Sequence, residues 1–496
     1  MRKTVSLQCQ NLIHIANHAL EQAHPGLEIG ITIHFQGYAG WLAKQVLSHA
    51  NLQWALVELF KKHDGCLLEI KERNGALHWK KSLSVSDAVR LTLSSQEMPI
   101  NGSKGLVRIK RSPSTLSIRS LHHLDGASGQ LAVQEIIRLC LQRFCSTYLG
   151  MPASRWLVSS VIAPTPPTSQ HTILDYTERQ QRTYHSIAYQ LFLDDLFSQF
   201  IQQNISTHHL NSTITGQQMG SSQTQLSKSQ LIKLKNSVTK TQSGKPIPTS
   251  ALLQMIWLIA LDQTNQSTII RVPYNARKNQ PHAKCMHYVA TATLFLLTIK
   301  DSDTLQTLWH RSKRYRQHYF RTINNVQPGM LIPAETILND LRKKVSGSAI
   351  VGKNQTELNA LLKQGISEFN FLPRSTVNPT RGVLKTTPYW GVAVDWASNL
   401  YKVDQSLTVT ECDNGDVRLT ISAKGQTARP LLNQMMQMIH ALNEDPQVNL
   451  RACKSLPKKQ AKNPVNSVKA SSRYQYIMVL IIGAILTRLW LKSMNQ

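Results

Sequence analysis

Residues 114–136 read STLSIRSLHHLDGASGQLAVQEI, a strand pattern that runs through a short polar connection into a helix pattern. Leu116 and Ile118 alternate with polar residues, which is typical of a half-buried strand. From 128 to 148, apolar residues recur at the spacing of one helix face: Val133, Ile136, Ile137, Cys140 and Phe144. The sequence therefore predicts a strand over 115–121 and a helix over 128–148, joined by a connection that holds two adjacent histidines.

The connection contains side chains suited to proton transfer. A histidine at an exposed strand end, here His122 or His123, is a candidate general base, because its pKa lies near neutrality. Asp125 could orient the connection through a charge-assisted hydrogen bond to an arginine, and Gly126 would allow close approach of backbone or substrate. Paired histidines near an aspartate also occur in ordinary loops, so this pattern alone leaves both interpretations open.

Strand and helix patterns alternate along both halves of the chain. In the first half we expect a strand at 28–35, a helix at 39–62, a hairpin at 66–79 turning at Asn74-Gly75, and a strand at 105–110. In the second half we expect helices at 179–203, 226–239, 249–263, 303–322 and 333–346, strands at 267–273, 287–299 and 369–373, a hairpin at 406–423, and a last helix starting near Pro430. Residues 204–229 are rich in Asn, Gln, Ser and Thr and are expected to form an exposed loop. This order favours an α/β or α+β fold with two similar lobes.

Composition shifts divide the chain. The prolines between 164 and 167 mark a lobe boundary, which predicts lobes at 1–165 and 166–450. Residues 451–473 carry a run of Lys and Arg without an acid and form a flexible basic linker. An apolar segment at 474–491 follows, in which YIMVLIIGAIL is free of charge. It is somewhat shorter than the roughly 20 residues of a full span, but Arg488 lies near its end and could snorkel. We expect a membrane anchor that leaves the main domain in the cytoplasm; the alternative is a buried terminal helix.

Bulk composition limits the partners. The 496 residues include 56 Lys and Arg against 28 Asp and Glu, a formal charge of +28, which suits anionic lipid or nucleic acid but selects neither. The seven cysteines contain no CxxC pair, which argues against a disulfide framework and a zinc ribbon. A histidine pair at His14 and His18 lacks the glutamate of a zinc-protease motif, so no metal is expected. The basic aromatic stretch at 303–320 is interpreted as an amphipathic helix rather than an RNA site.

Several segments resemble the chloramphenicol-acetyltransferase-like superfamily, which includes condensation domains and wax-ester synthase/diacylglycerol acyltransferases. The family motif HHxxxDG lies between a strand and a helix, where this chain has HHLDG. Further resemblance lies in FKKHDGCLLEI, in SKSQLIKLKNSVTKTQSGKPIPTSALLQMIWLIAL, in TIIRVPYNARK and in FNFLP, in the family's order along residues 28–445. The motif departs from the family, because only Leu124 separates His123 from Asp125. Counting back from Asp125 places Leu121 at the catalytic position, so either a shortened connection still brings a histidine to the site or the base is missing.

The resemblance implies two lobes with a tunnel between them. It implies that His123 is the base and His122 the first motif histidine, that Asp125 pairs with Arg277, that Gly126 and Ser128 border the substrate, and that Asn370 is structural. It also implies transfer of an acyl group from a CoA or carrier thioester to a hydroxyl or amine, including lipidic acceptors, without a bound cofactor or metal. The alternative is an inactive acyltransferase-like protein that binds an acyl ligand or partner at the membrane.

Overall fold

The structure is a computed structural model. It describes residues 3–4, 28–63, 67–73, 76–81, 83–94, 107–121, 126–148, 150, 152–155, 157–162, 184–202, 205–206, 219–239, 247–261, 267–274, 291–300, 302–312, 332, 334–347, 367–372, 383, 394–398, 405–412, 414–424, 427–445 and 447–450.

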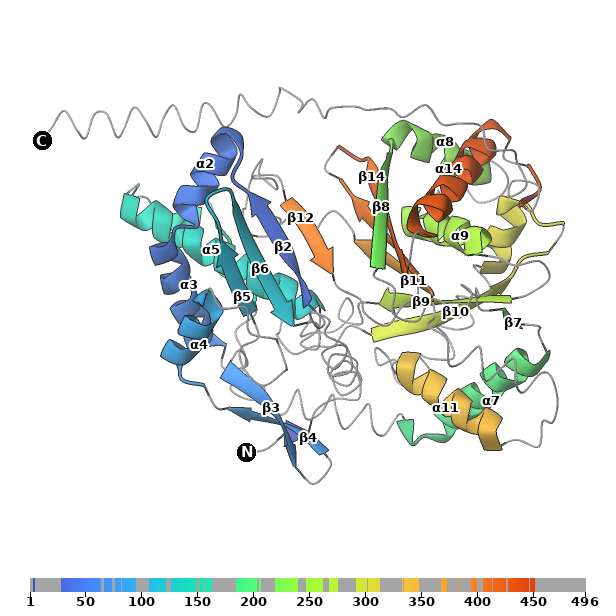
Figure 1. Cartoon of the computed structure of the whole chain (residues 1–496), viewed down its shortest axis with the longest axis horizontal. Coiled ribbons are helices and arrows are strands. Elements are labelled where there is room, and N and C mark those ends of the chain that lie inside the picture. Colours follow the sequence, from blue (N-terminus) through green and yellow to red (C-terminus); the bar gives the residue numbers. More distant parts are fainter. Residues whose placement is uncertain are drawn as a thin grey trace, which may run out of the picture.

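A four-stranded antiparallel sheet forms the centre of the first lobe (Figure 1). Its order is β12 (Val394–Ser398), β2 (Glu28–His34), β6 (Thr115–Leu121) and β5 (Val107–Arg111). The alternation predicted for β6 is confirmed, since Leu116 and Ile118 are fully buried and Ser117 is not. Strand β12 lies beyond the predicted lobe boundary in sequence, so the first sheet is completed from the second half of the chain.

Helices cover one face of this sheet, and they are α2 (Gly37–Val46), α3 (His49–Lys62), α4 (Val85–Leu93) and α5 (Gly126–Tyr148). The single helix expected over 39–62 is two helices. The break falls at Leu47 and Ser48, where the Ser48 hydroxyl caps α3 by accepting a hydrogen bond from the Asn51 backbone N–H at 3.4 Å. Such a cap satisfies a helix-end donor and favours a new helix start over a continuous one.

The predicted hairpin at 66–79 is confirmed as β3 (Leu68–Arg73) and β4 (Ala76–Lys81). With β1 (Lys3–Thr4) it makes a separate three-stranded sheet. The expected turn residues Asn74 and Gly75 lie outside the described residues.

A larger sheet forms the second lobe. Its order is β10 (Thr291–Thr298), β9 (Ser267–Tyr274), β11 (Ser367–Leu372), β13 (Gln405–Glu411), β14 (Val417–Lys424) and β8 (Met219–Leu226), with β7 (Ile205–Ser206) beside β9. Helices α8 (Lys228–Thr239), α9 (Thr249–Leu261) and α14 (Ala428–Glu444) share the main core with this sheet. Figure 1 shows them on the side of the sheet turned away from the first lobe. The predicted two-lobed α/β architecture is present.

Strand β8 corrects the expectation of an exposed loop over 204–229. It pairs with β14 along its whole length at the edge of the sheet. Its Gly220, Ser222 and Thr224 are the register partners of Ala423, Ile421 and Leu419 and share the face that α14 covers. Small polar side chains let the helix approach closely there, so an apolar alternation is absent although the segment is a strand.

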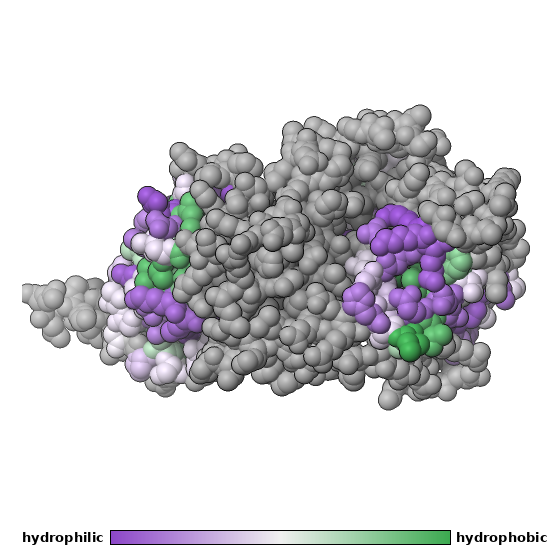
Figure 2. Space-filling model, turned by 90° about the horizontal axis from the view of Figure 1, so that it is seen from below, coloured by the Kyte–Doolittle hydropathy of each residue, from purple (hydrophilic) through white to green (hydrophobic). Residues whose placement is uncertain are grey.

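Two further helices pack together below the second sheet (Figure 1), namely α7 (Ile187–Gln202) and α11 (Ala334–Gly347). The hydroxyls of Tyr184 and Tyr189 donate to the Asp340 carboxylate at 3.1 and 2.9 Å. Figure 2 views the molecule from this side, where the described surface of the second lobe is largely hydrophilic around a smaller hydrophobic area.

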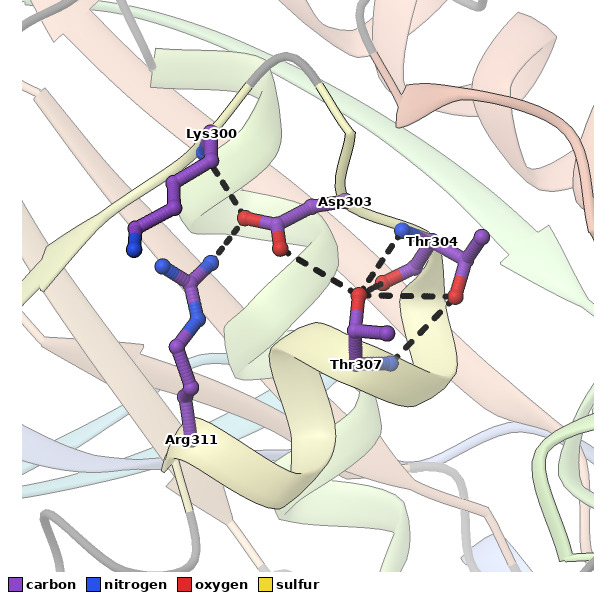
Figure 3. Close-up of polar contacts among 5 residues, drawn as sticks. All are labelled: Lys300, Asp303, Thr304, Thr307 and Arg311. Carbon is purple, nitrogen blue, oxygen red and sulfur yellow. Dashed lines mark hydrogen bonds and ion pairs between the residues drawn. The ribbon is translucent and has the colours of Figure 1, made fainter.

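A buried carboxylate fixes the start of the helix at residues 305–312 (Figure 3). Asp303 is 4% exposed and accepts from the Lys300 backbone N–H at 2.7 Å and from the Thr307 hydroxyl at 3.2 Å. It also forms an ion pair with Arg311. Burial lowers the pKa of that arginine, and it remains charged beside the carboxylate.

Among the described residues, no helix is both long and apolar enough to cross a bilayer. The predicted linker and anchor at 451–491 lie outside those residues and stay a prediction.

The predicted hairpin over 406–423 is confirmed as β13 and β14, and its turn gives a pH prediction. Asp416 accepts hydrogen bonds from the backbone N–H of Lys228 at 2.9 Å, and from the side-chain amides of Gln225 and Asn414, both at 2.7 Å. Burial acts to raise the pKa of this carboxyl, but the three hydrogen bonds outweigh burial and hold the pKa below its usual value.

We expect Asp416→Ala to lower the free energy of unfolding by about 1–2 kcal/mol at pH 7, because the Lys228 N–H at the start of α8 loses its acceptor. Since the folded-state pKa is depressed, this contribution is present above the unfolded pKa of about 4 and is lost as the pH falls through the folded value. Urea unfolding of both proteins at pH 7, 5 and 3.5 measures the difference. A difference that stays constant down to pH 3.5 contradicts the prediction.

Candidate active site

The site predicted from sequence lies where β6 passes into α5. Strand β6 ends at Leu121, which pairs with Glu28, and α5 begins at Gly126. The predicted strand and helix are therefore confirmed, and four residues connect them. His122, His123 and Asp125 belong to that connection and lie outside the described residues, whereas Ser128 lies in the first turn of α5. Their roles stay a prediction.

The helix that follows the motif is held by a buried ion pair. Glu135 and Arg138 are 1% and 4% exposed, and the guanidinium donates two hydrogen bonds to one carboxylate oxygen at 3.0 and 2.7 Å. The other carboxylate oxygen accepts from the Val161 backbone N–H at 2.7 Å, and Ser160 donates to the first at 3.3 Å. Helix α5 is thereby tied to the segment at 157–162.

The same segment joins the two halves of the chain. The Val158 backbone N–H donates to the carbonyl of Val383 at 3.0 Å, and the Val383 side chain packs with Leu157 and Val161. Together with β12, this contact brings the second half of the sequence to the elements that carry the motif.

The face of β6 opposite the core is polar. Thr32 and Ser117 are register partners with hydroxyls 3.5 Å apart, and Arg119 donates to the Thr32 hydroxyl at 3.2 Å. Gly30 is the register partner of Arg119. A Cβ atom on Gly30 would lie 2.0 Å from the Ile118 carbonyl oxygen and 2.9 Å from the Arg119 Cα. Because these are backbone atoms, β2 and β6 can pair this closely only with glycine at position 30.

We expect Gly30→Ala to lower the free energy of unfolding by about 3 kcal/mol, because the two strands must separate to admit the methyl group. Gly37→Ala is the matched control: its φ of +64° disfavours alanine, but a Cβ there meets nothing within 4 Å, so about 1 kcal/mol is expected. Urea unfolding of both variants checks this, and equal losses would contradict the steric argument.

A second buried ion pair lies in the large sheet. Arg271 on β9 and Glu368 on β11 are register partners, with Nε and Oε2 3.2 Å apart and side chains 13% and 1% exposed. Asn370, predicted to be structural, is half-buried two residues further along β11, opposite Thr408. The arginine assigned to Asp125 from sequence, Arg277, lies outside the described residues, so that pairing is untested. Within the described part of the chain, no group of His, Cys, Asp or Glu could hold a metal ion.

Comparison with known proteins identifies the fold. No protein-family model and no curated sequence matches the chain. Solved structures do match, among them the first condensation domain of the calcium-dependent antibiotic synthetase in complex with a substrate analogue. That structure has a TM-score of 0.61 and 11% identity, covering 91% of this chain and 99% of the other.

Two more structures have the same architecture. One is a mutant starter condensation domain of rhizomide synthetase in complex with C8-CoA and Leu-SNAC, at TM-score 0.61 and 14% identity over 91% and 96% of the two chains. The other is the condensation domain of monacolin K polyketide synthase, at TM-score 0.59 and 10% identity over 91% and 99%. This chain therefore has the condensation-domain form of the chloramphenicol-acetyltransferase-like fold, as its sequence predicts.

Proposed function

We propose that the protein transfers an acyl group from a CoA or carrier-bound thioester to an amine or hydroxyl acceptor. The fold match over 91% of the chain carries this proposal, because the similar rhizomide domain is in complex with C8-CoA, an acyl-CoA, and with Leu-SNAC, an aminoacyl thioester analogue. The strand-to-helix connection that holds two histidines in this sequence supports it.

The proposed chemistry needs one base and no consumed cofactor. The acceptor oxygen or nitrogen attacks the thioester carbonyl while His122 or His123 takes its proton. The new ester or amide bond forms as the carbon–sulfur bond breaks, and the departing thiolate takes the proton to leave as a thiol. Helix α5 begins at Gly126, the last residue of the motif, and the partial positive charge of its N-terminus would favour the oxyanion of the tetrahedral intermediate. Donor and acceptor would enter a channel between the lobes from opposite ends.

We further propose that the protein works at a membrane, held by the segment at 474–491 with its main domain in the cytoplasm. The basic linker at 451–473 supports this orientation, since such segments are retained beside an anionic cytoplasmic leaflet. Lipidic acceptors would then reach the site at high local concentration.

The test is acceptor-dependent thiol release by the full-length protein. Acyl-CoAs of increasing chain length are each supplied with a panel of amines, alcohols and diacylglycerol, and released CoA is measured with a disulfide reagent. A run without donor records the protein's own thiols; burial raises the pKa of the Cys140 and Cys145 thiols, so these two should react slowly. An acyl-carrier thioester replaces acyl-CoA in a parallel series, and release that matches the protein-free rate with every donor and acceptor would defeat the proposal.

A second candidate is an acyl-binding protein without turnover. The motif favours it, because two of the three residues between the second histidine and the aspartate are missing. Calorimetric titration with a non-hydrolysable acyl-CoA thioether distinguishes the two: binding without thiol release in the first assay would support this candidate over the enzyme.

A further inference from the structure

The outward face of α2 carries two exposed aromatic side chains. Tyr38 and Trp41 are 49% and 51% exposed, and their ring centroids lie 5.6 Å apart. They are three residues apart and so share one helix face, while Gly40, Ala43 and Val46 are buried on the other. The helix thus has one face packed in the lobe and an aromatic face in solvent.

Basic residues adjoin this face. Lys44 lies one turn after Trp41, and the Arg111 guanidinium donates to the Lys44 carbonyl at 3.2 Å. Strand β5 ends with the exposed residues Lys110 and Arg111, at the tip of the β5–β6 hairpin. Figure 1 shows this tip beside α2. At the start of α2, the Phe35 backbone N–H donates to the Ser114 carbonyl at 2.8 Å, so the hairpin tip and the helix form one surface. Neither Gly37–Val46 nor Val107–Leu121 contains an acidic residue.

We infer that this surface, formed by Tyr38, Trp41, Lys44, Lys110 and Arg111, is a contact site for an anionic lipid bilayer. Tyrosine and tryptophan favour the boundary between headgroups and acyl chains, because each has an apolar ring with a polar edge. The adjoining cations match the negative potential of anionic headgroups. Nucleic acid is a poorer fit, since the two rings already contact each other and the cations lie at one end of a helix rather than along a path that a phosphate backbone could follow.

This contact does not require acyl transfer. It shares its partner with the proposed anchor but has a different consequence. An anchor at one end of the chain does not by itself set which side of the lobes faces the lipid, whereas a second contact through α2 does. Two weak signals acting together are also how peripheral proteins commonly achieve stable membrane binding.

The experiment places a photo-crosslinking amino acid at position 41 of the full-length protein. Position 232 on α8 is the control, because Ile232 is likewise a large apolar residue, 45% exposed, on the other lobe. Both proteins are mixed with phosphatidylcholine vesicles with and without phosphatidylserine carrying a clickable tag. Crosslinking to tagged lipid should be at least about fivefold greater from position 41. Equal or absent crosslinking from the two positions overturns the inference, as does preferential crosslinking from position 41 to an added RNA oligonucleotide.

A charge-reversal pair tests the electrostatic part in the crosslinker protein. Lys110→Glu/Arg111→Glu should reduce lipid crosslinking from position 41 about tenfold. Lys61→Glu/Lys62→Glu, the same charge change at two exposed residues of α3, should have little effect. Similar losses from the two pairs would overturn the specific role of this surface. Thiol release with soluble substrates should be unchanged in either pair, so failure of the acyl-transfer proposal remains distinguishable from failure of this one.

Discussion

Replacing both motif histidines, His122→Ala/His123→Ala, is expected to lower kcat for thioester turnover by about 10²–10⁴-fold, the usual contribution of a positioned general base. One of the two single variants should lose nearly as much as the double, and the other should stay near the wild type. Stopped-flow measurement of CoA release at saturating acceptor gives the three rates.

The matched control is His208→Ala/His209→Ala, because this is the chain's other pair of adjacent histidines. It makes the same chemical change outside the motif and should leave the rate unchanged. A wild-type rate in all four variants would mean that neither motif histidine is the base, and Leu121 would then occupy the catalytic position that the family spacing predicts. Thermal unfolding of each variant separates a lost base from a lost fold.

Local patterns were enough to locate the candidate site. The residues that form the alternation in β6 are only a few positions apart in the sequence, and so are those that form the helical repeat in α5. The sequence therefore predicts both elements and the connection between them. The apolar helix α9 and the hairpin of β13 and β14 are predicted for the same reason, and Gly415 has the positive φ of +87° that an Asn-Gly turn requires.

Long-range pairing is what the sequence could not predict. Strand β12 is five residues long and pairs with β2, which lies more than 350 residues earlier in the chain, so no local pattern points to the first lobe. Strand β8 is polar because it lies at a sheet edge under α14, and its composition resembles that of a loop.

The buried ion pair of α5 was missed for a related reason. Glu135 and Arg138 are three residues apart on a helix, the spacing of an ordinary surface pair. The Glu135 carboxylate also accepts a hydrogen bond from the Val161 backbone N–H, 26 residues further along the chain, a contact that no local pattern predicts. The signal in the sequence is that apolar residues, Leu131 and Leu139, share the helix face that carries Glu135 and Arg138, opposite the apolar repeat that predicts the helix.

Arg138→Met is therefore expected to lower the free energy of unfolding by about 3–5 kcal/mol, because it leaves the Glu135 charge buried without its cation. Lys61→Met on α3 is the matched control. It breaks a Glu-Lys pair of the same spacing, in which the Lys61 Nζ lies 3.7 Å from the Glu58 Oε1 and the lysine side chain is 62% exposed. The loss in the free energy of unfolding should be no more than about 1 kcal/mol. Urea unfolding monitored by tryptophan fluorescence gives both values.

Glu135→Gln in the Arg138→Met background should recover about half of the loss or more, since glutamine removes the buried charge but still offers an oxygen to the Val161 N–H. Recovery would show that the uncompensated charge, rather than lost packing of the arginine, causes the instability. The rescued protein could unfold like the wild type but release thiol more slowly. The main effect of the ion pair would then be on the N-terminal end of α5, at Gly126, next to the motif histidines. A cost for Arg138→Met no larger than that for Lys61→Met would contradict both steps, since it would mean that α5 keeps its position without the pair.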